Sequence, residues 1–178
     1  MKVYFVRHTS VAVDGNHTCY GNTDVELRDT FEAEAAKTKD ALSLIPVQAA
    51  FTSPLSRAKR LAHFCGFDYA TEDNRLREMN FGEWEMLSWA DIITENTTEE
   101  FFKLYIDNKT PGGESLNDQL HRVSDFINEK KAMGYQAIVV FCHGGVINCA
   151  RTFAGQCSIE TAFSLIPDFG SITMIEYN

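Results

Sequence analysis

The chain has 178 residues, of which 44% are hydrophobic and 23% charged, ordinary values for one globular domain spanning residues 1–178. Its formal net charge of −9 argues against nucleic acid and an anionic membrane surface as partners, because both bind a basic face. The sequence shows neither a signal-peptide pattern at its N-terminus nor an apolar run of roughly 20 residues. We therefore expect a cytoplasmic protein without membrane contact.

The first half of the chain alternates between strand and helix patterns. Residues 2–6 predict a buried strand, and residues 30–45 predict an amphipathic helix with Thr30 as its N-cap. A second strand is predicted over 48–52. Ser53 and the proline after it suit a helix cap and a first helical position, so the next helix should run from there to about residue 65.

The second half continues the alternation after an acidic and aromatic segment. Residues 88–107 look helical, as two short pieces, and would form a small cap over about 86–110. The remaining predicted elements are a helix over 115–133, a strand over 136–141, a helix from Gly144 to about residue 154 and a strand over 171–177. Strands that alternate with long helices predict an α/β fold, with three α/β/α layers around a mostly parallel central sheet.

The cysteine pattern favours reduced thiols. The five cysteines are odd in number and form no Cys-x-x-Cys pair, and no export signal is present. Cys142 and His143 are adjacent, but no second pair lies at metal-ligand spacing. We therefore expect no structural metal.

Side chains suited to an anion follow three of the predicted strands. Arg7 and His8 end the first strand, and Arg57 lies one helical turn beyond the second. His143 follows the strand over 136–141. Each has an ordinary alternative: a strand ending at the surface, a solvated helix face, or a tight turn. Ligands gather beyond the carboxyl ends of parallel strands, however, so together these residues predict a phosphate-sized basic pocket.

A phosphoryl-transfer site also needs an acid for the leaving oxygen. The segment "LREMNFGEWE" offers Glu78, Glu83 and Glu85. Spacing alone does not say which of the three would act, and the segment could equally be a surface loop.

Five motifs, in order along nearly the whole chain, resemble the histidine phosphatase superfamily with its phosphoglycerate-mutase-like fold. "VRHT" resembles the family's strand-end Arg-His-Gly, and "FTSPLSRAKRLA" its Ser-Pro-Leu-x-Arg-Ala helix start. "LREMNFGEWE" resembles the acid-bearing loop, "PGGES" the Pro-x-Gly-Glu-Ser turn, and "VVFCHGGVI" the segment with the second histidine.

The resemblance implies a role for each matching residue. His8 would attack phosphorus and become phosphohistidine, while Glu78 would protonate the leaving group and then activate water. The other implied site residues are His143, as a third catalytic residue, and Arg7, Arg57, Tyr20, Gly21 and Gly144 as substrate-binding residues. A neutral imidazole is a good nucleophile near neutral pH, and arginine donates in a bidentate fork to phosphoryl oxygens. No metal or other cofactor is implied.

The first loop departs from the family pattern. Thr9 replaces the family's glycine, and Ser10 stands where many members have glutamate. From the loop over residues 9–24, we therefore transfer only the backbone near Tyr20 and Gly21 to the predicted site.

The resemblance favours a phosphatase over a mutase. Mutases of the superfamily are longer and carry a tail that shields the phosphoenzyme from water, whereas this sequence ends directly after its last predicted strand. The acid-bearing loop and compact length resemble the α-ribazole 5′-phosphate phosphatases of cobalamin assembly. The expected partner is then a small phosphate monoester, with a broad-specificity phosphatase or a phosphoglycerate mutase as alternatives.

Aromatic residues of the predicted cap allow two interpretations. They could form a wall for a flat base or the core of the cap, and the core is slightly favoured. These residues are Trp84, Trp89, Phe101, Phe102 and Tyr105.

Two functions of other classes compete with an enzyme. A phosphate-binding module without turnover would be expected to lack His8 or Glu78, and both are present. An interaction domain could use the acidic surface, although diffuse negative charge commonly serves solubility. The sequence does not predict the oligomeric state.

Overall fold

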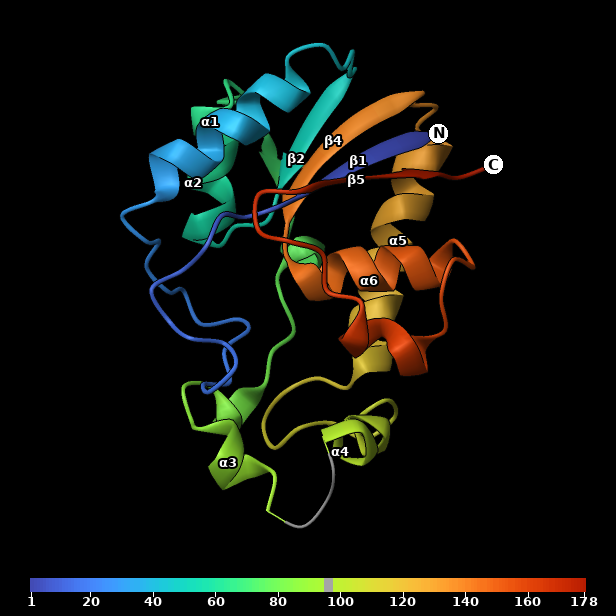
Figure 1. Cartoon of the computed structure of the whole chain (residues 1–178). Helices are drawn as coiled ribbons and strands as arrows, with labels where there is room; N and C mark the ends of the chain where they lie inside the picture. Colours follow the sequence, from blue (N-terminus) through green and yellow to red (C-terminus); the bar gives the residue numbers. More distant parts are fainter. Residues whose placement is uncertain (95–97) are drawn as a thin grey trace.

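A five-stranded sheet forms the centre of the computed structural model, which describes residues 1–94 and 98–178. Residues 95–97, inside the predicted cap, lie outside the described residues. The strand order is β3-β2-β4-β1-β5 (Figure 1). The strands are β1 (Lys2–Arg7), β2 (Ala49–Thr52), β3 (Thr71–Glu72), β4 (Ala137–Cys142) and β5 (Ile172–Glu176). The first four are parallel and β5 runs antiparallel to β1, which confirms the mostly parallel sheet.

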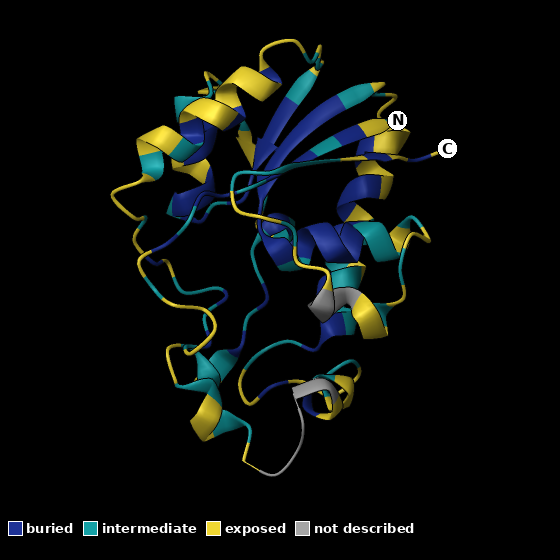
Figure 2. Cartoon of the chain, in the orientation of Figure 1, coloured by how far each residue is buried: buried dark blue, intermediate teal, exposed yellow. Residues whose placement is uncertain are grey.

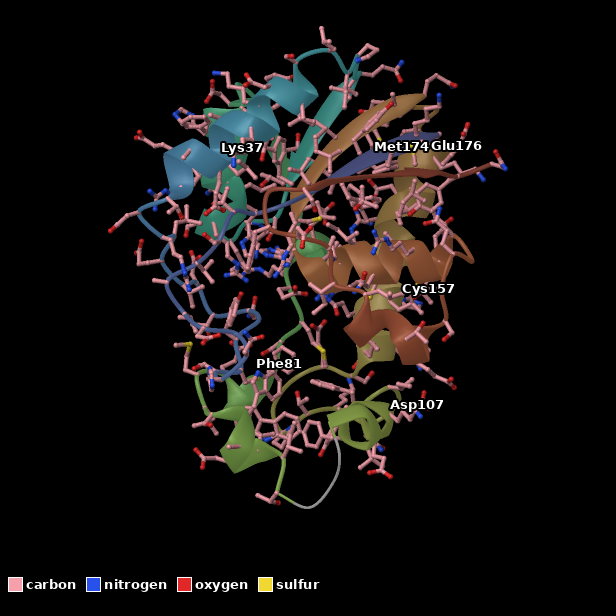
Figure 3. All side chains as sticks on the ribbon, in the orientation of Figure 1. Lys37, Phe81, Asp107, Cys157, Met174 and Glu176 are labelled. Carbon is pink, nitrogen blue, oxygen red and sulfur yellow. The ribbon has the colours of Figure 1, made fainter. Side chains whose placement is uncertain are left out.

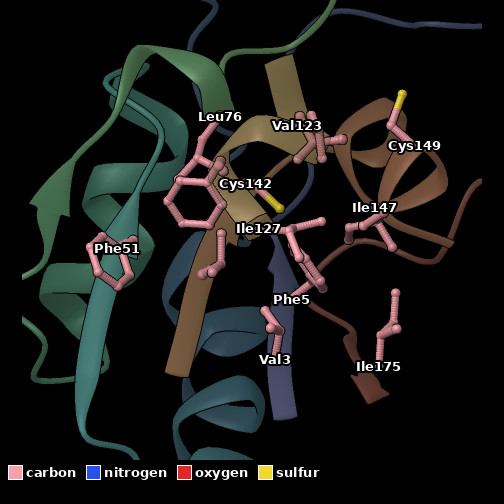
Figure 4. Packing of buried hydrophobic residues seen from close by; sticks show 14 of the residues in the cluster. Val3, Phe5, Phe51, Leu76, Val123, Ile127, Cys142, Ile147, Cys149 and Ile175 are labelled. Carbon is pink, nitrogen blue, oxygen red and sulfur yellow. The ribbon is translucent and has the colours of Figure 1, made fainter. Parts of the chain in front are cut away.

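Helices cover both faces of this sheet. On one face, α1 (Phe31–Leu42) and α2 (Ser56–Phe64) pack through alanines and leucines against buried residues of β1, β2 and β4. On the other, α5 (Leu116–Ala132) and α6 (Gly144–Phe153) enclose the larger core (Figure 4). Figure 2 shows that buried residues follow the strands and the inner sides of these helices. The three-layer α/β/α architecture is therefore present.

Short helices lie beyond one end of the sheet, opposite the two termini (Figure 1). They are η1 (Asn74–Leu76), η2 (Gly82–Trp84), α3 (Trp89–Ile92) and α4 (Thr98–Leu104). The last two match the two short helical pieces predicted for the cap. A further 3₁₀ helix, η3 (Ile159–Ser164), follows α6.

One predicted helix start is confirmed and one is wrong. Thr30 is the N-cap residue of α1 as predicted, although its hydroxyl donates to the Glu34 carboxylate and does not accept from a backbone N–H of the helix. Helix α2 begins at Ser56, whose backbone N–H donates to Asp24 at 3.0 Å, so a carboxylate from a distant loop caps it. The hydroxyl of Ser53 lies inside the protein and contacts His143.

All five cysteines are free, as the sequence predicts. Cys19, Cys142 and Cys149 are buried, and burial raises the pKa of each thiol. Among the described residues, no helix is long and apolar enough to span a membrane.

Candidate functional site

A cavity of about 580 Å³ lies beyond the carboxyl ends of β1 and β4, between the sheet and the cap. Its polar wall includes Arg7, His8, Tyr20, Glu78 and Gly144, which are five of the eight predicted site residues. The other three, Arg57, His143 and Gly21, are buried behind this wall. The structure therefore gathers the predicted residues in one region but gives only some of them direct access to the cavity.

The His8 imidazole has a defined tautomer. Its Nδ1 lies 2.7 Å from the Thr9 carbonyl oxygen, which can only accept, so Nδ1 carries the proton. Nε2 is then unprotonated, and His8 contributes to the cavity wall although it is only 2% exposed. Burial, followed by the charges of Arg57 and Arg7, lowers the His8 pKa well below its usual value. The side chain is thus a neutral imidazole with a free lone pair.

His143 packs behind His8, with the two ring centroids 5.2 Å apart. The Arg57 Nε–H donates to His143 Nδ1 at 3.3 Å, so the proton of His143 resides on Nε2, which donates to the Ser53 hydroxyl at 2.8 Å. Burial and the Arg57 charge lower the pKa of His143 as well. This second imidazole is neutral and has both nitrogens occupied.

Arg57 is a fully buried cation whose hydrogen bonds hold the loop before α1. Its terminal nitrogens donate to the carbonyl oxygens of Thr23, at 2.8 Å, and Gly21. The nearest carboxylate, Asp24, is 3.9 Å away. Burial lowers the pKa of Arg57 from its usual value. In this arrangement Arg57 positions the loop and His143 and places a positive charge behind His8.

Of the two arginines predicted for the site, Arg7 is the one that lines the cavity. One terminal nitrogen donates to the Pro167 carbonyl oxygen, and the guanidinium carbon lies 3.7 Å from the centroid of the Phe169 ring. Its Nε is buried and has no hydrogen-bond partner in the described part of the chain. Gly144 leaves space next to it, since an added Cβ there would lie 3.5 Å from Nε. An unpaired buried donor of a cation, beside the start of α6, is suited to an anion.

The three candidate glutamates differ in their surroundings. Glu85 accepts hydrogen bonds from the Thr23 hydroxyl and four backbone N–H groups. Burial alone would raise its pKa, but these hydrogen bonds outweigh burial and lower it. Glu83 is exposed, and only Glu78 lines the cavity. Glu78 is therefore placed to exchange a proton there, while Glu85 holds the Gly21–Thr23 backbone.

The cap aromatics divide into two groups. Trp84, Phe101 and Tyr105 pack on one another, with ring centroids 4.8 to 5.3 Å apart, and form part of the core of the cap. Trp89 and Phe102 instead join Phe81 in the cavity wall. Figure 3 labels Phe81, which lies at the base of the cap beside α3. Two of the five aromatic residues thus line the cavity, and three belong to the core of the cap.

Sequence reasoning did not single out Gln119, which lines the cavity and contacts Glu78. A signal was present, because Gln119 is a polar residue between Leu116 and Val123 on the inward face of the predicted helix. In the part of the chain that the structure describes, no three His, Cys, Asp or Glu side chains group as a metal site would require.

The sequence is similar to those of known phosphatases and mutases. The putative phosphoserine phosphatase 2 of Hydrogenobacter thermophilus is 24% identical over 98% of this chain and 88% of its own length. The 2,3-bisphosphoglycerate-dependent phosphoglycerate mutase 2 of Gloeobacter violaceus is 29% identical over 80% of this chain and 70% of its own length.

Among solved structures, the α-ribazole phosphatase from Shigella flexneri superposes with a TM-score of 0.84. The match covers 100% of this chain and 91% of that one, and at 22% identity it shows a shared fold. The sequence pattern of the histidine phosphatase superfamily (branch 1) matches residues 3–178. This protein therefore belongs to branch 1 of the histidine phosphatase superfamily, which includes phosphatases and mutases.

Proposed function

We propose that this protein hydrolyses small phosphate monoesters through a phosphohistidine formed on His8. The observation that carries the proposal is the pairing of two unsatisfied groups at one cavity. His8 Nε2 has a free lone pair for phosphorus, and Arg7 Nε has a free proton for a phosphoryl oxygen. Such a pair stabilises the charge of a transferring phosphoryl group while an in-line nucleophile attacks it.

The reaction would proceed in two displacements. First, Nε2 of His8 attacks phosphorus, the P–N bond forms, and the P–O ester bond breaks as Glu78 gives its proton to the departing alkoxide. Water then gives a proton to Glu78 and attacks phosphorus, the P–N bond breaks, and phosphate leaves. The sum is one ester and one water converted to one alcohol and one phosphate, with His8 and Glu78 regenerated.

The buried residues behind the wall would support this chemistry without touching the ester. The Arg57 guanidinium donates to two loop carbonyls and to His143, which keeps the positive charge fixed behind His8. A fixed charge in a water-poor site stabilises developing negative charge more effectively than a solvated one. Arg57 would therefore act through its field and through the loop that it holds.

For the substrate, we propose α-ribazole 5′-phosphate, which would place the protein in assembly of the cobalamin nucleotide loop. Phe81, Trp89 and Phe102 offer aromatic surface for a flat base, in the same cavity as His8. The fold shared with the α-ribazole phosphatase from Shigella flexneri is consistent with this choice. Broad-specificity hydrolysis and mutase activity are the competing outcomes of the test.

The test compares kcat/KM for α-ribazole 5′-phosphate, 3-phosphoglycerate, a sugar phosphate and an aryl phosphate, with a metal chelator present. A preference of about 100-fold for the first ester, or about 2.7 kcal/mol, would support the proposed substrate. Similar rates for all esters would indicate broad specificity, and isomerisation of 3-phosphoglycerate without phosphate release would indicate a mutase. Trp89→Leu should reduce the preference while leaving the rate with the sugar phosphate within about threefold.

The covalent step has a separate test. Acid-quenched enzyme should carry labelled phosphate from the substrate, and His8→Ala should abolish both this label and turnover. Retention of near-normal turnover by His8→Ala would refute the phosphohistidine mechanism.

A further inference from the structure

Three N–H groups from three separate segments hold the Glu78 carboxylate. Its Oε1 accepts from the Met79 backbone at 3.0 Å and from Gln119 Nε2 at 2.8 Å. Its Oε2 accepts from the backbone of Gly145, in the first turn of α6, at 3.0 Å. The loop that contains Met79, helix α5 and helix α6 therefore all orient the Glu78 side chain.

The contacts distinguish the two carboxylate oxygens. A carboxylate has about four acceptor positions, two on each oxygen. The hydrogen bonds from Met79 and Gln119 fill both positions on Oε1, whereas Oε2 receives one hydrogen bond from the described residues. The remaining position for a proton, a leaving oxygen or a water is thus on Oε2.

The amide of Gln119 is oriented at a cost. A carboxylate only accepts, so Nε2 must face Glu78, and the buried Gln119 Oε1 is left with no hydrogen-bond partner among the described residues. Gln119 is only 1% exposed, and a buried carbonyl without a hydrogen bond destabilises the folded protein. A residue selected only for packing would avoid this cost, because an apolar side chain of similar size would fill the same space.

We propose that Gln119 is a positioning residue for the acid: by occupying Oε1 of Glu78, it makes Oε2 the oxygen that exchanges the proton. The inference rests on the proposed hydrolysis, in which Glu78 protonates the leaving group. Gln119 donates to Glu78 and would act on the reaction through that carboxylate.

The test uses Gln119→Met, which keeps the length of the side chain but removes both amide atoms, with two substrates. An alkyl phosphate needs a proton on its leaving oxygen, whereas a nitrophenyl phosphate releases a stable anion without one. For the alkyl ester we expect kcat to fall about 10- to 100-fold, since a misplacement of about 1 Å can cost about 100-fold. With nitrophenyl phosphate the change should stay within about threefold, and Tm should not fall because no unsatisfied carbonyl remains.

Ser124→Ala is the matched control, since Ser124 lies in the same helix and its hydroxyl donates to the Leu120 carbonyl oxygen. It should change neither the ratio of the rates on the two substrates nor Tm. Equal losses on both substrates with a lower Tm would show that Gln119 is merely structural and would overturn the inference, as would an unchanged kcat for the alkyl ester. If the unmodified protein hydrolyses neither ester, the proposed function fails, and the positioning role fails with it.

Discussion

Mild acid should destabilise this protein because two imidazoles are buried in their neutral form. Burial and the charge of Arg57 lower the pKa of both His8 and His143 well below the usual value. In the unfolded chain each would titrate near its ordinary pKa of about 6.5. Below that pH the unfolded chain binds two protons that the folded protein does not, so the free energy of unfolding must fall as the pH falls.

The size of this effect follows from linkage. Each imidazole that stays neutral in the folded state contributes up to about 1.4 kcal/mol per pH unit below its unfolded pKa. Between about pH 7 and about pH 5, two such groups together lower the free energy of unfolding by up to about 4 kcal/mol. That is a large share of the 5–15 kcal/mol expected for a whole domain.

Urea unfolding at several pH values between these limits would measure the effect. The slope of the free energy of unfolding against urea concentration must stay the same at each pH. His8→Asn should roughly halve the pH dependence, because one of the two groups is gone. The chain also has three exposed histidines, His17, His63 and His121, which are unchanged in these variants. A change in the pH dependence can therefore be assigned to the buried histidine that was replaced. An unchanged pH dependence in His8→Asn/His143→Asn would refute the reasoning, since the two buried imidazoles could not then be its source.

Two further substitutions test the buried side of the site. Arg57→Met should lower the free energy of unfolding by about 3–5 kcal/mol, because it leaves the Gly21 and Thr23 carbonyl oxygens unpaired. Denaturant titration measures this change, and a loss below about 1 kcal/mol would contradict the expectation. Gly145→Ala should lower kcat/KM at least about 10-fold, because the new Cβ would lie 2.4 Å from Oε1 of Glu78 and the carboxylate must move. Activity within about threefold of the unmodified protein would show that the carboxylate position matters little.

The sheet and the convergence of the two histidines could be predicted from the sequence because buried strands and strong helix patterns determine them. The short strand β3 was missed, since its two residues are both exposed and show no alternation. The start of α2 was also misplaced. Its cap comes from Asp24, 32 residues away, and such a contact leaves no local pattern near Ser56.

Within the site, the grouping of the strand-end residues was predictable, but which of them line the cavity was not. Sequence motifs identified Arg57 and His143, yet only the packing shows that both lie behind the cavity wall. The choice between Glu78 and Glu85 likewise depends on hydrogen bonds. Glu85 is occupied by a loop more than 60 residues away in the chain, whereas Glu78 faces the cavity.

The buried free thiols provide built-in reporters of local opening. A thiol that is enclosed and has a raised pKa reacts with an alkylating reagent only while the surrounding structure is open. Cys19 belongs to the small cluster with Met79 and Phe81 next to the cap, whereas Cys142 belongs to the large core under α5 and α6. Alkylation rates at the two positions would therefore separate local opening next to the cap from unfolding of the whole domain, without any label being introduced.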